Sequence, residues 1–387
     1  MAIAANTDGR HAGPKERPAG ARKARTLAEA WNASREGGRA RARNNFDAIR
    51  LVAAVAVVLS HSFEIVAGDR STEPLFRLTG QISLGELAVL VFFAASGFLI
   101  ADSWRRRPDL ADFAARRAAR IFPALWINVA ALAFIIGPMV SRLDAGVYFA
   151  DPQVARFLPA ALLVNIGWTL PGVFETAPIA GAVNYPLWSL AFEAMGYGLI
   201  AALGAMRRMS PASLGVAFAA LMALHLSPPG EGADAMAVLA YRMSLVLPTF
   251  CAGAIAACVA PAIKMTWRRA FLALGALALT GAVGGMVAAF SIAGTYLVLF
   301  VATVDLGPVA AAGRRGDFSY GIYLWGWPAQ QFVQTILAPA HWAANFALAA
   351  PIVGALAYLS WRFVERPALI SIRHKAPPRE NREPSTP

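Results

Sequence analysis

Ten apolar segments, each close to the length of a membrane-spanning helix, dominate the 387-residue sequence. A bilayer core needs about 20 mostly apolar residues per helix. Soluble domains carry about 25% charged residues, whereas this chain has 15%. We therefore predict an all-α integral membrane protein with about ten transmembrane helices. The predicted spans are residues 46–66, 84–103, 119–140, 187–206, 211–227, 237–259, 268–289, 291–307, 318–338 and 343–363.

Basic residues in alternate loops predict how the chain is oriented in the membrane. Cytoplasmic loops of membrane proteins carry an excess of Lys and Arg, and here the basic clusters follow every second predicted span. One orientation, with both termini in the cytoplasm, satisfies the whole pattern. The net charge of +12 is therefore explained by topology and by attraction to membrane lipid, and we expect no nucleic-acid partner.

The two ends of the chain differ in composition from its middle and predict three regions. Residues 1–43 are polar and basic and lack an apolar run of signal-peptide length, so we expect a disordered cytoplasmic arm. Residues 44–368 form the membrane domain, and residues 369–387 form a short disordered cytoplasmic tail. The longest outer loop, 141–186, contains an amphipathic stretch that is expected to lie in the membrane interface or to form a re-entrant lid.

Ionisable side chains inside predicted spans are costly and mark functional sites in membrane proteins. Arg50 and His61 are eleven residues apart in the first span, so they share a helix face and lie about 16.5 Å apart along the axis. Counted from the outer surface, Glu193 in the fourth span has a depth similar to that of His61. We expect the two to act as a general base and the carboxylate that orients it. The alternatives are snorkelling of Arg50, a packing hydrogen bond from His61 and a structural role for Glu193.

Two arginines at the start of the third span suggest an anion site. Arg117 and Arg120 are three residues apart and share a helix face, so their guanidinium groups can clamp phosphate. A purely topological role is the alternative. In the second span, Ser96 and Gly97 form a notch where another helix or a ligand can approach closely. The five histidines indicate no metal site, because no two are three or four residues apart.

Six short motifs follow one another in order within residues 44–368. They are Arg50 with His61, the segment 92–100 around Ser96-Gly97, Arg117 with Arg120 before Pro123, Trp188-Ser189-Leu190 with Glu193, Phe318-Ser319-Tyr320 with Tyr323, and Glu365. In this order they resemble the membrane-bound acyltransferase family 3, which O-acylates sugars and cell-surface glycans in bacteria. One difference is Gly326, which stands where many members of the family have a histidine.

The resemblance implies an O-acyltransferase of the bacterial inner (plasma) membrane. Its co-substrate would be a cytoplasmic acyl-CoA, and acetyl-CoA is the one the family resemblance favours. Its acceptor would be a hydroxyl of a cell-surface or lipid-linked glycan. No cofactor would be bound. The resemblance also implies that Arg50, Arg117 and Arg120 bind the donor and that His61 and Glu193 are catalytic. Candidates for the substrate pocket are Ser96, Trp188, Ser189, Tyr320 and Tyr323.

A proton-coupled multi-pass transporter is the main alternative, because buried Arg, His and Glu side chains also form proton relays. A lipid-linked sugar flippase or a non-catalytic membrane partner is a third class. Many transporters contain inverted repeats or paired broken helices, and neither is apparent in this sequence, so the enzyme is favoured.

Overall fold

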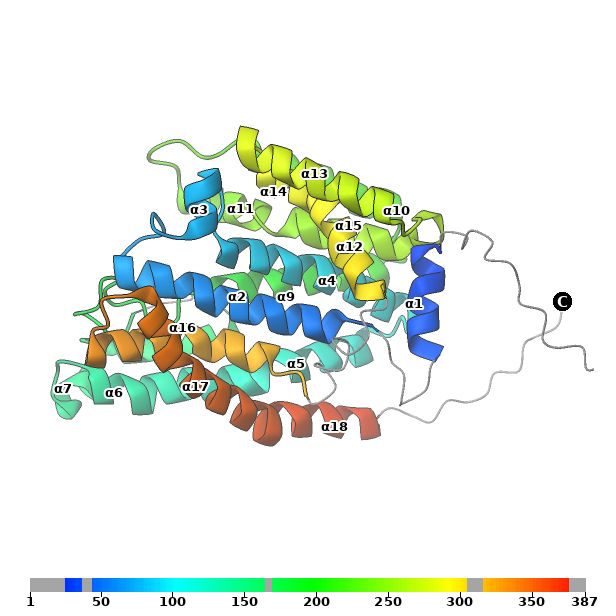
Figure 1. Ribbon diagram of the computed structural model, residues 1–387. Coiled ribbons are helices and arrows are strands. Elements are labelled where there is room, and N and C mark those ends of the chain that lie inside the picture. Colours follow the sequence, from blue (N-terminus) through cyan, green and yellow to red (C-terminus); the bar gives the residue numbers. More distant parts are fainter. Residues whose placement is uncertain (1–24, 37–43, 164–168, 305–315, 376–387) are drawn as a thin grey trace, which may run out of the picture.

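The computed structural model describes residues 25–36, 44–163, 169–304 and 316–375, and these form helices and no β-sheet. The main helices of the bundle run roughly along one axis (Figure 1). They are α2 (Phe46–Ala67), α4 (Leu84–Arg106), α5 (Leu110–Ala131), α9 (Leu187–Ala205), α10 (Pro211–His225), α12 (Leu247–Cys258), α13 (Trp267–Val283), α15 (Thr295–Thr303), α16 (Ser319–Leu337) and α17 (Trp342–Ser360). The other helices are α1 (Leu27–Glu36), α3 (Pro74–Thr79), α6 (Gly137–Val140), α7 (Ala145–Ala150), α8 (Pro152–Phe157), α11 (Ala235–Ser244), α14 (Met286–Ala289) and α18 (Arg366–Lys375).

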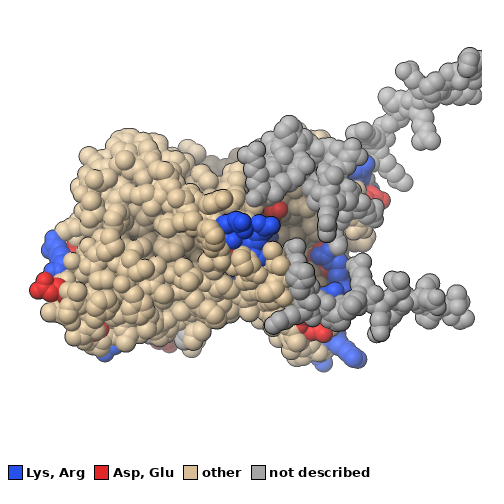
Figure 2. Space-filling model, turned by 90° about the horizontal axis from the view of Figure 1, so that it is seen from below, with Lys and Arg blue, Asp and Glu red and all other residues tan. Residues whose placement is uncertain are grey.

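The predicted spans fall on helices or runs of joined helices, but one predicted boundary is wrong. The sequence places the turn between the seventh and eighth spans at residue 290, whereas the chain turns at Gly284 and Gly285, and Met286–Thr303 forms one helical run. Within the described ranges, six helical runs are long and apolar enough to cross a membrane, and a seventh is added if α11 and α12, which meet at a 42° bend, form one span. On the face seen in Figure 2, most of the surface is uncharged, and charged side chains lie at the two ends of the long axis and in one basic cluster between them. The chain is therefore a helical membrane protein.

Local sequence signals explain where several helices begin and end. Ser83 and Glu86 form a reciprocal capping box at the start of α4, which satisfies two backbone donors that the first helical turn leaves free. Gly68 ends α2 with a φ of 87°, a left-handed conformation that glycine adopts without strain. π-helical turns at Leu132–Ile136, Phe290–Gly294 and Trp361–Glu365 join successive helices into longer runs.

Helix α4 lies at the centre of the bundle and packs most closely against α12. Gly97 faces the backbone of α12, where a Cβ atom would lie 1.9 Å from the carbonyl oxygen of Phe250. Gly253 faces α4 in turn, and a Cβ there would lie 2.3 Å from the carbonyl oxygen of Ala94. The notch predicted at Ser96-Gly97 is thus a site of close helix packing, which holds Ser96 against the neighbouring helices.

The substitution Gly97→Ala is expected to destabilise the protein by at least about 1–3 kcal/mol, because the added methyl group forces α4 and α12 apart. Thermal unfolding in detergent measures the effect as a lower melting temperature. Gly198→Ala is the matched control, since nothing lies within 4 Å of a Cβ at that position in α9 and alanine favours the helix. Equal melting temperatures for the two variants would contradict the close contact.

The expectation of a fully disordered arm over residues 1–43 is wrong for its described part. Helix α1 lies across the end of the bundle at which α2 begins (Figure 1), and its Leu27 and Trp31 are almost completely buried. The Trp31 ring packs against Phe46 and Phe98 at centroid distances of 5.6 and 5.4 Å. Leu27 and Trp31 are four residues apart and share one face of α1, so the helix has an apolar side to bury. Residues 1–24 and 37–43 lie outside the described part.

Two further expectations about non-membrane segments are revised. Residues 369–375 of the predicted disordered tail belong to α18, which packs against α5, whereas 376–387 lie outside the described residues. In the loop 141–186, the part from residue 169 onward enters the bundle instead of lying in the interface. Its Val173 and Phe174 are fully buried, and the side-chain amide of Asn184 donates to Asn128 Oδ1 and to the carbonyl of Leu324. The predicted amphipathic stretch precedes this part. Its Phe157 is buried and its Leu162 is 61% exposed, and residues 164–168 lie outside the described residues, so its place in the interface or in a lid stays a prediction.

Candidate functional site

A cavity of about 730 Å³ opens between α2, α4, α5, α9, α16 and α18. Eight of the ten residues predicted for the site line it, namely Arg50, Ser96, Arg117, Arg120, Ser189, Glu193, Tyr320 and Tyr323. The two predicted residues outside the lining are His61 and Trp188. The fold therefore brings together motifs from five different helices. We call the end of the bundle at which α2, α5 and α16 begin the arginine end, and the other the opposite end.

A carboxylate that the sequence analysis did not assign to the site organises the arginine end. Asp317, just before α16, accepts from Arg120 at 2.6 Å and from Arg50 at 3.1 Å. Arg120 also lies 3.5 Å from Glu365, and Glu365 accepts from Ser360. The charges of Arg50 and Arg120 are thus largely neutralised by protein carboxylates, and these arginines connect α2, α5 and α16.

Arg117 differs from its two neighbours. Its guanidinium group lies over the rings of Phe113 and Tyr197 at about 6 Å, and its Nε atom is buried without a hydrogen-bond partner. Among the described residues, no carboxylate forms an ion pair with it. A buried, uncompensated cation is costly, so Arg117 supplies the cavity with a positive charge that an anionic ligand would neutralise.

Asp317 lies just before α16, outside the membrane-spanning helices, and the groups around it set its charge state. Burial raises the pKa of this carboxyl, but the guanidinium groups of Arg120 and Arg50, together with hydrogen bonds to Ser319, outweigh burial and lower the pKa from 3.8 to about 2. The carboxylate therefore stays ionised at neutral pH and keeps the two arginines in place.

The substitution Asp317→Asn is expected to lower the free energy of unfolding by about 3 kcal/mol near neutral pH, because two buried guanidinium groups lose the carboxylate they share. Since the pKa of Asp317 is depressed in the folded state, its contribution is complete above about pH 4 and is lost as the pH falls toward about 2. Thermal unfolding at a series of pH values should show the difference between wild type and variant shrinking over that range. A difference that stays constant would contradict the assignment.

Glu193 lies at the middle of the cavity wall and has two hydroxyl partners. Ser96 donates to its Oε1 at 2.7 Å, and Tyr197, one turn further along α9, donates to the same oxygen at 2.6 Å. The Glu193–Tyr197 spacing of four residues places both on one helix face, a signal present in the sequence. These bonds fix the carboxylate between α4 and α9. Tyr197 also lies under the guanidinium group of Arg117, so the same tyrosine contacts both charged side chains.

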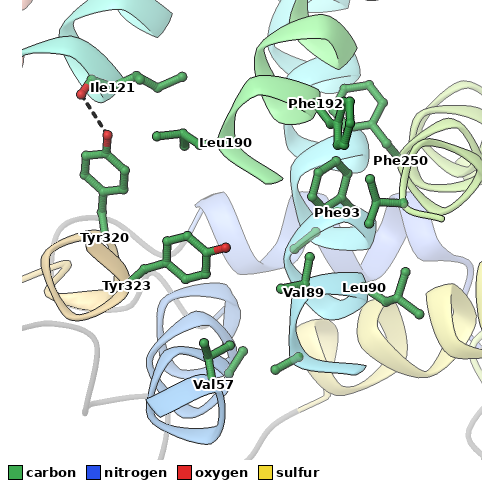
Figure 3. Close-up of a cluster of buried hydrophobic side chains, with 14 of the residues drawn as sticks. Val57, Val89, Leu90, Phe93, Ile121, Leu190, Phe192, Phe250, Tyr320 and Tyr323 are labelled. Carbon is green, nitrogen blue, oxygen red and sulfur yellow. Dashed lines mark hydrogen bonds between the residues drawn. The ribbon is translucent and has the colours of Figure 1, made fainter. Parts of the chain in front are cut away.

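Two tyrosines of α16 form the boundary of the cavity toward the opposite end. Figure 3 shows them leaving the helix in different directions, with the Tyr320 hydroxyl donating to the carbonyl of Ile121 at 2.8 Å. The Tyr323 hydroxyl lies 2.5 Å from Ser189 Oγ and donates to the carbonyl of Pro186 at 3.0 Å. The N-terminus of α9 is thereby tied to α16 inside the bundle.

His61 does not meet Glu193, contrary to the sequence-based expectation. Its ring lies edge-on against Trp327 at 4.9 Å, its buried Nδ1 has no partner, and in the described part of the chain no hydrogen bond joins it to Glu193. The depth estimate failed because the inward-folded loop starts α9 inside the bundle, where Pro186 contacts Tyr323. The sequence-based estimate places Glu193 six residues from the outer membrane surface. Because α9 begins inside the bundle, Glu193 lies nearer the arginine end than that estimate implies.

Gly326 and Trp188 show how the surroundings of the cavity depart from expectation. A Cβ at position 326 would lie 2.7 Å from Cγ2 of Val58, so glycine allows α16 to approach α2 and brings Trp327 against His61. Trp188 packs against Phe192 at 5.6 Å and does not line the cavity, which contradicts its assignment to the substrate pocket. Its position on the side of α9 away from the cavity is the reason.

Comparison with known proteins gives an independent view of the chain. Residues 43–362 match the family model described as "Acyltransferase domain". The chain is 28% identical to the "O-acetyl transferase" of Shigella phage Sf6, with 84% of this chain and 95% of the relative covered. It is 30% identical to "Nodulation protein 10" of Rhizobium leguminosarum bv. viciae, with 84% and 93% covered, and 27% identical to "Exopolysaccharide production protein ExoZ" of Rhizobium meliloti, with 75% and 91% covered. No solved structure matches the chain.

Proposed function

The chain belongs to acyltransferase family 3 and is an O-acyltransferase, and we propose that it transfers an acetyl group from cytoplasmic acetyl-CoA to a hydroxyl of a cell-surface or lipid-linked glycan. The names of two relatives, an O-acetyl transferase and an exopolysaccharide production protein, support the acetyl group and the glycan. The proposed location is the bacterial inner membrane.

The proposed topology has ten spans with both termini in the cytoplasm. The basic loops support this orientation, and it directs the arginine end of the bundle, with Arg50, Arg117 and Arg120, to the cytoplasm. A cavity lined by these residues would then open to the compartment that contains acyl-CoA. The opposite end would face the periplasm, where a surface glycan is assembled.

The observation that carries the proposal is Arg117, a cavity-lining cation that has no carboxylate partner among the described residues and whose buried Nε atom has no hydrogen-bond partner there. Its guanidinium can bind a phosphate of coenzyme A bidentately. Arg50 and His61 share one face of α2 and lie about 16.5 Å apart along its axis, a distance comparable to an extended pantetheine arm. The donor's phosphates at the arginine end would thus place its thioester close to His61.

The proposed chemical step uses His61 as general base. The acceptor oxygen attacks the thioester carbonyl carbon, a C–O bond forms and the C–S bond breaks. The hydroxyl proton passes to His61 and then to the departing thiolate, so the products are an O-acetyl ester and free coenzyme A. His61 contacts Trp327, which is one helical turn, about 6 Å, beyond Tyr323, so the thioester must pass the Tyr323–Ser189 pair that closes the cavity.

Purified protein in phospholipid vesicles tests the proposal. With acetyl-labelled acetyl-CoA and the glycan isolated from a strain that lacks the gene, we expect labelled O-acetyl ester on the glycan and stoichiometric free thiol. The native glycan of the parent strain should exceed that of the deletion strain in mass by the acetyl groups. Proton-coupled solute flux across the vesicles without ester formation would instead favour the transporter.

A further inference from the structure

We infer that the opposite end of the bundle contains a sugar-binding subsite beside His61, in which Glu64 accepts a hydroxyl of the acceptor and the Tyr185 ring supports its apolar face. This inference rests on the proposed function and names the chemistry that recognises the acceptor. Neither residue belongs to the cavity at the arginine end.

Glu64 is placed by the geometry of α2. It follows His61 by three residues, so the two side chains share one helix face and are separated by about 4.5 Å along the axis. The Glu64 side chain is half-buried, and no hydrogen bond or ion pair links its carboxylate to another described residue. Nearby acids pair elsewhere, as Glu86 does with Arg70 at 3.0 Å. Arg70 attracts the Glu64 carboxylate without forming an ion pair with it, so this carboxylate can still accept hydroxyl hydrogen bonds, and the Nδ1 atom of His61 has no partner among the described residues.

Tyr185 reaches the same place from the inward-folded loop. Its ring lies 5.5 Å from the ring of Trp327, which in turn meets His61, and 38% of Tyr185 is exposed. The charged groups near its phenol are Arg242, Glu64, Glu86 and Arg70. The Trp327 ring thus contacts both the Tyr185 ring and the His61 imidazole, and Glu64 follows His61 by about one turn of α2.

The loop that carries Tyr185 is held rigidly. The indole N–H of Trp327 donates to the carbonyl of Ala182 at 2.7 Å, and Gln331 donates to the carbonyls of Ile179 and Ala182. Asn184 adds the bonds to Asn128 and Leu324 described above. A ring held in this way loses little entropy on binding, which suits a recognition surface.

The arrangement matches a neutral sugar better than an acidic one. A pyranose presents C–H groups on one face and hydroxyls at its rim, so it can contact an aromatic ring and donate hydrogen bonds at the same time. Around the Glu64 carboxylate lie two further acids, Glu86 and Glu73, and one cation, Arg70, and this excess of negative charge would repel a carboxylated sugar. The hydroxyl held by Glu64 would keep its neighbour on the sugar within reach of His61 for deprotonation.

Steady-state kinetics with acetyl-CoA and the de-esterified glycan as the two substrates tests the subsite. We expect Glu64→Gln and Tyr185→Ala each to raise the KM for the glycan by about tenfold or more, with the KM for acetyl-CoA and its Kd unchanged. Tyr185→Phe keeps the ring and should restore a KM near that of wild type. Glu175→Gln is the matched control, since Glu175 lies exposed in the same loop.

The outcomes separate this inference from the proposed function. Wild-type protein that forms no ester on the glycan defeats the proposed function and the subsite together. Wild-type transfer combined with an unchanged glycan KM in both variants overturns the subsite alone. Equal increases in both KM values also overturn it, because they indicate a general structural effect. An unchanged Kd for acetyl-CoA shows that a variant has folded.

Discussion

The substitution His61→Ala is expected to lower the rate of acyl transfer by about 10²–10⁴-fold, the range by which a positioned general base accelerates a reaction. Folding should survive the change, because the buried Nδ1 of His61 has no hydrogen-bond partner and its removal leaves no other polar group unsatisfied. The measurement is transfer of labelled acetyl to the glycan by protein in vesicles, normalised to the amount inserted.

A second histidine provides the control for this prediction. His341 precedes α17, where its side chain caps the helix and its ring lies against Trp342, so His341→Ala removes an imidazole other than the one that contacts Trp327. We expect it to keep nearly full transfer activity. If His61→Ala is inserted normally and still transfers acetyl at a rate close to that of wild type, another group removes the proton.

The substitution Arg117→Ala is expected to raise the KM and the Kd for acetyl-CoA by about 10–100-fold, because a charge-assisted hydrogen bond is worth about 1.5–3 kcal/mol. The KM for the glycan should stay unchanged, since the acceptor is proposed to bind at the opposite end. Isothermal titration with acetyl-CoA and two-substrate kinetics measure the two effects separately.

Arg208→Ala is the control for Arg117, because Arg208 is exposed in the loop after α9 and lies outside the cavity. Its loss should leave the affinity for acetyl-CoA within about twofold of wild type, as expected for a surface charge. If Arg117→Ala weakens donor and acceptor equally, the cation does not act on the donor.

Arg50 and Arg120 are less informative targets, although the sequence presents all three arginines alike. Both bind Asp317, and Arg120 also contacts Glu365, so replacing either one removes an ion pair that connects the helices of the bundle. Such a change destabilises the fold and lowers activity whether or not the arginine meets the donor. The lack of a carboxylate partner is what makes Arg117 a clean test.

Much of the architecture could be predicted from local patterns. Apolar runs of helical length located most of the helices of the bundle, because a helix in lipid must satisfy its backbone internally and must expose apolar side chains. The motif residues predicted for the site largely meet in one cavity. The notch at Gly97 could also be predicted, because only a residue without a Cβ allows two helix backbones to approach so closely.

Other features could not be predicted in this way. In the sequence, Asp317 is an acid in a loop between two predicted spans, and no local pattern indicates its partners. In the structure it binds Arg50 and Arg120, which are far from it in the sequence. Trp31 looked like part of a polar arm, and its burial depends on rings contributed by α2 and α4. Interactions of this kind appear only when distant segments are brought together.

The sequence by itself determined the class of protein, the approximate helices and the residue types of the site, since hydropathy and helical periodicity are properties of neighbouring residues. The tertiary structure alone decided which of these residues meet. Because residues 169–186 fold into the bundle and α9 starts inside it, Glu193 joins Ser96 and Tyr197, whereas His61 joins Trp327. Counting residues along α9 gives the depth of Glu193 only relative to the first residue of that helix, and the preceding loop decides where in the bundle that first residue lies.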